Sequence, residues 1–184
     1  MSHICRVCAE PMPKDRKGPD QVCPKCLKFP QQAQYKQFMF ESNHIEGEDR
    51  VNPGDIEAVE YALATDDLCL GCILQIHQIL GAYLNKPWVG KLRTCAVYVG
   101  AYTPPAAIAV PWAMENYCKL LHGMNSWDAH NMFQKIHPFQ DLNGRVGRLI
   151  WLTKAVNEGY KFKIPFLQAY YYQTLSQYEF NRER

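Results

Sequence analysis

The sequence predicts a mainly α-helical fold. A helical domain with one small β-hairpin is expected in residues 30–184, preceded by a small four-cysteine zinc ribbon in residues 1–29. Three observations lead to this prediction. Apolar residues recur at helical spacing through much of the chain, most clearly in residues 68–84. A single β-rich run, residues 94–99, lies between glycine and proline turns. Two Cys-x2-Cys pairs stand in an N-terminal segment too polar to form a hydrophobic core.

The composition fits one compact domain with a small appendage. The chain has 184 residues, of which 47% are hydrophobic, and a formal net charge of +2. Nothing in it resembles a signal peptide or an apolar run long enough to span a membrane, so we expect a cytoplasmic protein. In that compartment the eight cysteines are expected to be thiols or metal ligands and not disulfides. The net charge is too small to imply that the whole chain binds nucleic acid, and the oligomeric state cannot be read from the sequence.

The N-terminal cysteines have the spacing of a zinc site. Cys5 and Cys8 form one pair, and Cys23 and Cys26 form the other. Each pair can supply two thiolates from one tight turn, so that together they complete a tetrahedral site for a structural Zn²⁺. The alternative is four unligated cysteines in a disordered tail. The ribbon is basic, so its partner could be a nucleic acid or an acidic protein, or its charges could only be solvated.

The helical domain is expected to begin with a helix in about residues 35–48, where Tyr35, Phe38 and Met39 share one face. Asp55 can cap the next helix, which carries apolar residues on one side. Both helices follow from periodicity and local capping signals alone.

A longer helix is predicted for residues 68–84, opened by a pair of aspartates. Cys69 and Cys72 fall inside it, on or near its apolar face, so we expect buried free cysteines. A third metal knuckle is the alternative, but a helix interior is the wrong backbone for one. His77 lies on the same helix and is expected to be a hydrogen-bonded core histidine and not a catalyst.

The second half of the domain begins with the strand and turn of residues 92–104, which the following prolines end. Pro111 begins a helix, and Ser126 caps another that leads to His137. A final tyrosine-rich helix is expected in residues 164–178, as an amphipathic packing face.

The stretch HPFQDLNGRVGR, residues 137–148, has the composition of an anion site. Asn143 and Gly144 favour a tight or left-handed turn that exposes several backbone amides. The helix that follows aims N–H groups and the positive end of its dipole at an anion. Arg145 and Arg148 are three residues apart, so both can bind successive phosphates from one helix face.

Two further residues of this stretch suit phosphate transfer. Asp141 offers a hard oxygen ligand for a Mg²⁺ ion that also binds phosphate oxygens. His137 can accept a proton near neutral pH. The alternative is an ordinary loop–helix junction with two surface arginines.

These residues resemble the signature of the Fic family, HxFx(D/E)GN(G/K)RxxR. The matches, in order and spacing, are His137, Phe139, Asp141, Asn143, Gly144, Arg145 and Arg148. The single departure is Leu142, where the family has glycine. The resemblance implies a Fic-type helical fold and transfer of AMP from ATP to a Ser, Thr or Tyr hydroxyl of a target protein. It makes His137 the base, Asp141 the ligand of Mg²⁺ or Mn²⁺, and the last four matches the nucleotide-phosphate site.

A second resemblance lies upstream. Residues 42–47 match the (S/T)xxxE(G/N) pattern of a Fic inhibitory helix, with Ser42 and Glu46 at its fixed positions. In that family the glutamate pairs with the second signature arginine, here Arg148, and so occupies the place of the γ-phosphate. The alternative is an ordinary helix end with Gly47 as its C-terminal cap.

Residues 92–104 resemble the Fic flap, a hairpin whose exposed edge holds the target protein beside the histidine. The target itself is not written in the sequence. Two rival functions stay open. One is transfer of another nucleotide or phosphate group, or the reverse reaction, removal of AMP. The other is a nucleotide-binding pseudoenzyme or regulatory module acting through its ribbon. Both depend on Leu142: if this position needs a positive φ, leucine costs on the order of 1–2 kcal/mol and tilts the loop amides.

Overall fold

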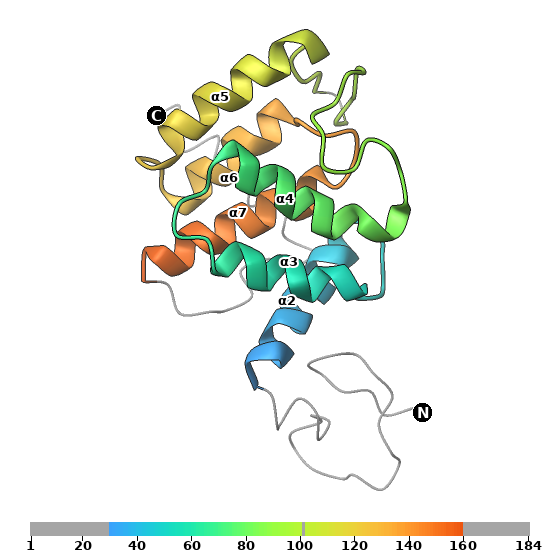
Figure 1. Cartoon of the computed structure of the whole chain (residues 1–184), viewed down its shortest axis with the longest axis vertical. Helices are drawn as coiled ribbons and strands as arrows, with labels where there is room; N and C mark the ends of the chain where they lie inside the picture. The colour runs from blue at the N-terminus through green and yellow to red at the C-terminus, as the bar shows by residue number, and fades with distance from the viewer. Residues whose placement is uncertain (1–29, 101, 160–184) are drawn as a thin grey trace, which may run out of the picture. The chain divides into compact units, whose positions relative to one another are not determined.

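The computed structural model describes residues 30–100 and 102–159 (Figure 1). The predicted zinc ligands Cys5, Cys8, Cys23 and Cys26 and the tyrosine-rich helix lie outside these residues. The chain divides into two compact units, one of Met1–Val51 with Phe162–Arg184 and the other of Asn52–Lys161. Residues 30–51 are the described part of the first unit, and the signature loop belongs to the second.

The first unit contributes one described helix, α2 (Pro30–Ile45). Its residues Tyr35, Phe38 and Met39 are buried, as their spacing suggested. The helix ends three residues earlier than expected, and Gly47 follows it with a φ of 81°. That left-handed backbone closes the turn after the helix, which is the role expected of a C-terminal glycine.

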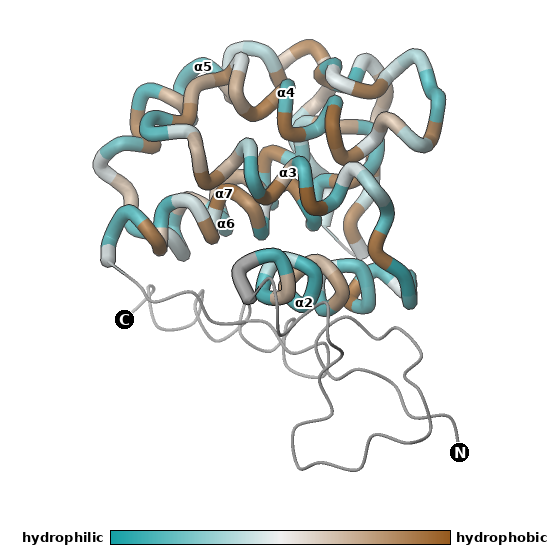
Figure 2. Tube along the Cα trace, turned by 60° about the horizontal axis from the view of Figure 1, so that its bottom comes forward, coloured by the Kyte–Doolittle hydropathy of each residue, from teal (hydrophilic) through white to brown (hydrophobic). Residues whose placement is uncertain are grey.

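The second unit is built from helices. In order along the described residues they are α3 (Pro53–Leu63), α4 (Leu70–Gly81), the short 3₁₀ turns η1 (Ala82–Leu84) and η2 (Ala107–Ala109), α5 (Val110–Leu121), α6 (Ser126–Ile136) and α7 (Asn143–Asn157). Along α3 and α4, hydrophobic and hydrophilic segments alternate (Figure 2), as expected for helices that bury one face.

The central helix of this unit is α7, which packs against α3, α4 and α6 (Figure 1). Most of its residues are buried, including Val146, Leu149, Ile150 and Leu152 with no exposed area. A helix covered on nearly every side cannot move without disturbing its neighbours. The first turn of α7, which carries the signature, therefore stands on a rigid support.

Helices α6 and α7 approach each other closely at Gly147. A Cβ atom at this position would overlap Nε2 of Gln134 and lie 3.2 Å from Nδ1 of His130, both on α6. A larger residue here would have to displace the Gln134 side chain and press against α6. The two helices that begin and end the signature loop are thus held at a fixed separation.

The N-terminal caps of α3, α4 and α6 differ from the sequence-based expectation. Asn52 and not Asp55 caps α3, and Asp55 is the third helical residue, whose Oδ2 accepts from the Asn52 N–H at 2.7 Å. Asn125 and not Ser126 caps α6. The long helix starts at Leu70 with Cys69 as its cap, so the prediction that Cys69 is buried inside a helix is wrong. Apolar periodicity continued past the true boundary because Leu68 is buried although it precedes the helix.

The predicted β-hairpin is reduced to a single antiparallel bridge. Val99 and Tyr102 exchange two backbone hydrogen bonds of 3.0 and 2.9 Å, and no longer strand forms in the described residues. The neighbouring carbonyls of Cys95 and Pro105 accept from the Arg93 guanidinium instead. Backbone acceptors used in this way are lost to a β-ladder, which explains why the pairing does not extend. Among the described helices, none combines the length and the hydrophobicity needed to cross a bilayer.

Candidate active site

Helix α6 delivers His137 to the start of the signature loop. His137 is the C-terminal cap of α6, with a left-handed backbone (φ 49°, ψ 60°), and its N–H donates to Phe133 at 2.9 Å. The ring is half-buried, and its Nδ1 lies 3.3 Å from the carbonyl oxygen of Gln134. A carbonyl can only accept, so Nδ1 carries the proton in this arrangement. In the neutral ring the basic lone pair then belongs to Nε2.

Arg93 fixes the backbone around His137 by hydrogen bonds to main-chain carbonyls. Its Nε donates to the His137 carbonyl at 2.8 Å, and its Nη2 lies 3.5 Å from the Ile136 carbonyl. The Arg93 N–H also donates to the Pro138 carbonyl at 2.9 Å. The remaining contacts of the guanidinium reach the segment before η2, through the carbonyls of Cys95 and Pro105.

A buried cation at the C-terminus of a helix complements the partial negative charge of the last carbonyls. Arg93 is only 3% exposed, and this burial lowers the pKa of its guanidinium. Sequence reasoning treated Arg93 only as the start of a strand. Nothing local marks an arginine whose partners are all main-chain carbonyls, because all of those partners except the Cys95 carbonyl come from distant parts of the chain.

The interior of the loop is tied together by Asn143. Its Oδ1 accepts from the Phe139 N–H at 2.8 Å, and its Nδ2 donates to the Phe139 carbonyl at 2.9 Å. Both ends of the amide are therefore used to brace the loop. The part of Asn143 that can bind a phosphate is its main-chain N–H in the first turn of α7. The prediction that Asn143 belongs to the phosphate site therefore stays a prediction, and it concerns this N–H and not the side chain.

His77 on α4 supports the loop from below. Its ring stacks on Phe139, with centroids 3.8 Å apart and planes within 5°. Nδ1 accepts from the Gly90 N–H at 2.8 Å, so Nε2 carries the proton and donates to the Asp141 carbonyl at 3.2 Å. Burial lowers the pKa of His77 to about 4, which keeps the ring neutral. The expectation of a hydrogen-bonded core histidine is confirmed.

Leu142 adopts the conformation that normally calls for glycine. Its φ is 65° and its ψ is 7°, and it is the N-terminal cap of α7. The side chain is 3% exposed and points toward α4, where a Cβ on Gly81 would lie 3.2 Å from its Cδ1. The Leu142 N–H donates to the Oδ1 of Asp141 at 2.6 Å. The positive φ thus exists, and the leucine is retained by packing into the space that Gly81 leaves open.

The first turn of α7 forms the anion-binding part of the site. The N–H groups of Asn143, Gly144 and Arg145 have no preceding helical turn to donate to. Arg145 is 7% exposed, and its Nη1 lies 3.4 Å from the Tyr83 hydroxyl. Its buried Nε has no hydrogen-bond partner within the described residues. A buried donor of this kind is costly to leave unpaired, so the position favours a bound anion.

Arg148 follows one turn later and is fully buried. Its charge helps to lower the pKa of His130 on α6, after the larger effect of burial, to about 4. Ser42, 1% exposed, and Glu46, in the exposed turn after α2, belong to the first unit. The pairing of Glu46 with Arg148 therefore stays a prediction.

Asp141 is exposed beside this anion site, and its Oδ1 is bonded to the Leu142 N–H. In the described part of the chain, no three His, Cys, Asp or Glu side chains converge on a point where they could hold a metal ion. A lone carboxylate fits a Mg²⁺ ion that takes its other ligands from phosphates and water. The residues present are therefore compatible with a metal that arrives with a nucleotide.

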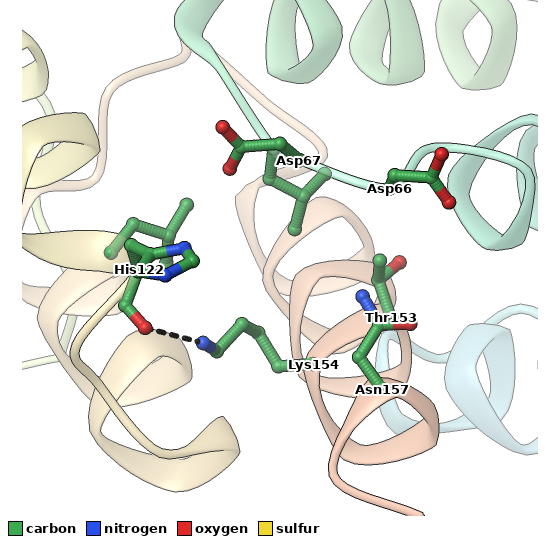
Figure 3. Close-up of a pocket in the computed structure, with 8 residues that line it drawn as sticks. Asp66, Asp67, His122, Thr153, Lys154 and Asn157 are labelled. Atoms are coloured by element: carbon green, nitrogen blue, oxygen red, sulfur yellow. Dashed lines mark hydrogen bonds between the residues drawn. The ribbon is translucent and has the colours of Figure 1, made fainter.

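A pocket of about 380 Å³ lies at the other end of α7 (Figure 3). It is lined by residues of the α3–α4 connection, such as Asp66 and Asp67, and by Thr153, Lys154 and Asn157 of α7. Lys154 Nζ donates to the His122 carbonyl at 3.3 Å across one side of it. None of the predicted site residues lines this pocket.

Comparison with known proteins agrees with this geometry. Residues 67–153 match the Fic/DOC family. A curated relative, the protein adenylyltransferase Fic of Drosophila willistoni, is 34% identical over 97 residues, which are 48% of this chain and 20% of the relative. The Aedes aegypti protein of the same name is 30% identical over 117 residues, 56% of this chain and 23% of the relative. The chain thus spans about one fifth of the length of these relatives.

Solved structures show the same fold. Fic-1 from C. elegans superposes with a TM-score of 0.66 at 19% identity, covering 85% of this chain and 59% of that one. A Fic domain containing signalling protein from Bacteroides thetaiotaomicron superposes with a TM-score of 0.63 at 18% identity, covering 84% of this chain and 74% of that one. The mainly helical fold predicted from the sequence is confirmed.

Proposed function

We propose that the chain carries a Fic domain and transfers AMP from ATP to a Ser, Thr or Tyr hydroxyl of a target protein; the match of residues 67–153 to the Fic/DOC family supports this. The observation that carries the proposal is the Arg145 guanidinium, buried at the N-terminus of α7 with an unbonded Nε. Arg145 lies in the same signature stretch, residues 137–148, as the half-buried His137. The relatives from Drosophila and Aedes are named protein adenylyltransferases, which supports the same reaction.

In the proposed reaction, Nε2 of His137 accepts the proton of the target hydroxyl as its oxygen attacks the α-phosphorus of ATP. A new P–O bond forms to the target, the bond between the α-phosphorus and the bridging oxygen breaks, and pyrophosphate leaves. The first-turn N–H groups of α7 and the Arg145 guanidinium stabilise the charge on the phosphates. Arg93 and Asn143 keep the two ends of the loop in position.

Asp141 is the proposed ligand of Mg²⁺ or Mn²⁺ in this reaction. Such an ion would neutralise phosphate charge when bound. Because one oxygen of Asp141 already accepts from the Leu142 N–H, we expect only its other oxygen to be available. This predicts one metal–carboxylate bond. It also predicts that the protein binds the metal only weakly when no nucleotide is present.

The test is incubation of the full chain with α-labelled nucleoside triphosphates, one at a time, with Mg²⁺ or Mn²⁺ and candidate targets. Label on protein from ATP supports AMP transfer, and label from another nucleotide would replace AMP by that group. His137→Ala should abolish labelling and leave nucleotide binding nearly intact, because the imidazole is not part of the phosphate site. His122→Ala is the matched control, since this exposed histidine lies outside the loop. Unchanged labelling in His137→Ala would refute the assigned role.

Nucleotide binding without transfer is the second candidate. It is favoured by the Leu142 N–H, which donates to the Asp141 carboxylate and so is not directed at a bound phosphate. ATP binding with no transfer in any variant, including Leu142→Gly and Glu46→Gly, would select this candidate.

We also propose that Glu46 inhibits the reaction by pairing with Arg148. The support is the Ser42–Gly47 pattern and the turn in which Gly47 has a positive φ directly after α2. Glu46→Gly should raise labelling, and Arg148→Ala should lower it. The double variant should resemble Arg148→Ala, because no inhibition is left to release. Glu48→Ala, in the same exposed turn, is the control that should change nothing.

The segment 92–104 is the proposed flap, although only one bridge pairs among its described residues, 92–100 and 102–104. The support is a set of exposed side chains next to that bridge: Tyr98 is 76%, Tyr102 46% and Val99 39% exposed. A target chain would extend the pairing by its own backbone. Tyr98→Ala should raise the KM for a target and leave its kcat nearly unchanged.

The zinc ribbon of Cys5, Cys8, Cys23 and Cys26 completes the proposal. Its support is the paired Cys-x2-Cys spacing alone. Elemental analysis of freshly purified, reduced protein should find one zinc per chain. Absence of zinc in folded protein would rule the ribbon out.

A further inference from the structure

Two thiols meet at the N-terminus of α4. Cys69 is the N-terminal cap, with an extended backbone (φ −101°, ψ 173°), and Cys72 lies in the first turn. The Cys72 N–H donates to the Cys69 sulfur at 3.3 Å, and the two sulfurs are 2.9 Å apart. A disulfide joins sulfur atoms at about 2.05 Å. A movement of about 1 Å would therefore bring these atoms to bonding distance.

The two thiols differ in exposure and acidity. Cys69 is exposed, whereas Cys72 is half-buried, with its sulfur 3.7 Å from the Asp67 carbonyl oxygen. The hydrogen bond from the Cys72 thiol, followed by the Cys72 N–H, lowers the pKa of Cys69. Burial, followed by the hydrogen bond with Cys69, raises the pKa of Cys72. The Cys69 sulfur is thus suited to attack a molecule that arrives from solvent. The neighbouring Cys72 thiol keeps its proton.

Neither a metal site nor ordinary core cysteines explain this arrangement. Zinc held by protein side chains needs more than two ligands, and no third His, Cys, Asp or Glu completes a site within the described residues. Core cysteines would be covered, as Cys118 is in part, where burial raises the pKa to about 11. By contrast, Cys69 is exposed, and so are Asp66 and Asp67 shortly before it, which line the pocket of Figure 3.

We propose that Cys69 and Cys72 form a reversible dithiol–disulfide pair, a modification site that exchanges with small-molecule disulfides of the glutathione class. The Cys69 thiolate attacks one sulfur of the external disulfide, which breaks and releases one thiolate that takes up a proton. The Cys72 thiol then loses its proton and attacks the Cys69 sulfur, releasing the second small thiol. The protein loses two electrons and two protons, and the external disulfide takes them up and is reduced to two thiols.

The chain offers a clean readout for this exchange. Tryptic peptide 51–91 contains Cys69 and Cys72 and no other cysteine, and peptide 94–119 contains Cys95 and Cys118 as an internal reference. The full chain is equilibrated with graded ratios of oxidised to reduced glutathione, quenched with acid, alkylated, digested and weighed. As the ratio rises, peptide 51–91 should change from the doubly alkylated form to a form without alkyl groups that is two hydrogens lighter than the dithiol, and dithiothreitol added before alkylation should reverse this, at ratios where peptide 94–119 remains doubly alkylated.

Single variants assign the roles of the two sulfurs. Cys72→Ser should trap glutathione on Cys69, because the second step is removed. Cys69→Ser should trap several times less, because Cys72 is half-buried and keeps its proton. In the wild type, Cys69 should be alkylated several times faster at neutral pH than the exposed Cys95. Peptide 51–91 that stays reduced while Cys95 acquires glutathione, or that forms only mixed adducts, would overturn the proposal.

Discussion

The signature loop is bounded by two residues with left-handed backbones that are held in different ways. His137 (φ 49°) opens the loop and Leu142 (φ 65°) closes it. Around His137 the restraints are polar: Arg93 donates to the carbonyls on both sides of the turn. Around Leu142 the main restraint is packing of an apolar side chain in the space above Gly81. The reactive end is fixed by directional bonds, and the anion-binding end by shape.

This difference teaches how glycine can be replaced at a loop that needs a positive φ. The backbone cost of leucine is on the order of 1–2 kcal/mol. Burying a leucine side chain contributes about 1.5–3 kcal/mol, enough to offset it. A residue that looks unfavourable at the loop is therefore compensated by a contact with another helix. The predictions below test each half of the loop in turn.

The largest effect is expected at the polar end. Arg93→Ala removes the cation that satisfies the carbonyls of His137, Cys95 and Pro105, and it leaves these partly buried acceptors without that donor. We expect a loss of about 3 kcal/mol or more in the free energy of unfolding, measured by urea titration, and loss of transfer. Arg93→Lys keeps the charge without the planar fork, so it should recover only part of both. Equal stability of Arg93→Ala and wild type would show that the loop does not depend on this clamp.

Lowering the pH is expected to destabilise the half of the signature loop around Leu142. His77 has a pKa of about 4 in the folded protein and an ordinary value of 6.5 in the unfolded chain. The unfolded chain therefore binds more protons between these values, and stability should be full above pH 6.5 and fall steadily toward pH 4. The loss from this group is roughly 2–3 kcal/mol. Arg93 stays charged throughout this range, so its hydrogen bonds around His137 persist. Protonation of His77 therefore weakens the half of the loop around Leu142.

Urea unfolding at several pH values between 4.5 and 7.5 measures this slope. His130 has its own pKa of about 4 and contributes to the slope as well. His77→Gln should therefore reduce the slope without abolishing it, whereas the exposed His122→Gln should leave it intact. An unchanged slope in His77→Gln would mean that His77 titrates normally in the folded protein.

Gly81→Ala tests the apolar end directly. The new Cβ would lie 2.9 Å from Cγ1 of Val89 and 3.2 Å from Cδ1 of Leu142. We expect a loss of about 1–3 kcal/mol in the free energy of unfolding, because overpacking displaces both side chains. Gly71→Ala is the matched control on the same helix, where the nearest atom would be 3.7 Å away. It should be neutral or stabilising, since alanine favours helix over glycine by up to about 1 kcal/mol.

The sequence was sufficient for the helical fold and for the motif, because both depend on local spacing. Periodicity located α4 and α7, and the order of residues 137–148 identified the loop. It could not locate the Arg93 clamp, whose acceptors come from residues 95, 105 and 136–138. It placed Cys69 in a helix interior because the buried Leu68 extended the apolar pattern. It also could not decide the φ of Leu142, which depends on the space at Gly81.

The smallest expected effect is a difference in stability between two substitutions of Leu142, and it is also the most specific to the comparison. Leu142→Ala removes the packing on Gly81 but keeps a Cβ, so the backbone cost remains and we expect a loss of about 2–3 kcal/mol. Leu142→Gly loses the same packing but relieves the left-handed strain, and it should be the more stable variant by about 1 kcal/mol. Glycine is normally the more destabilising of the two, so this reversed order is diagnostic of strain at a positive φ. Unfolding in urea orders the two variants, and labelling at saturating ATP shows whether relaxed loop amides raise turnover. If alanine proves the more stable, packing alone holds the loop end and the leucine carries no strain.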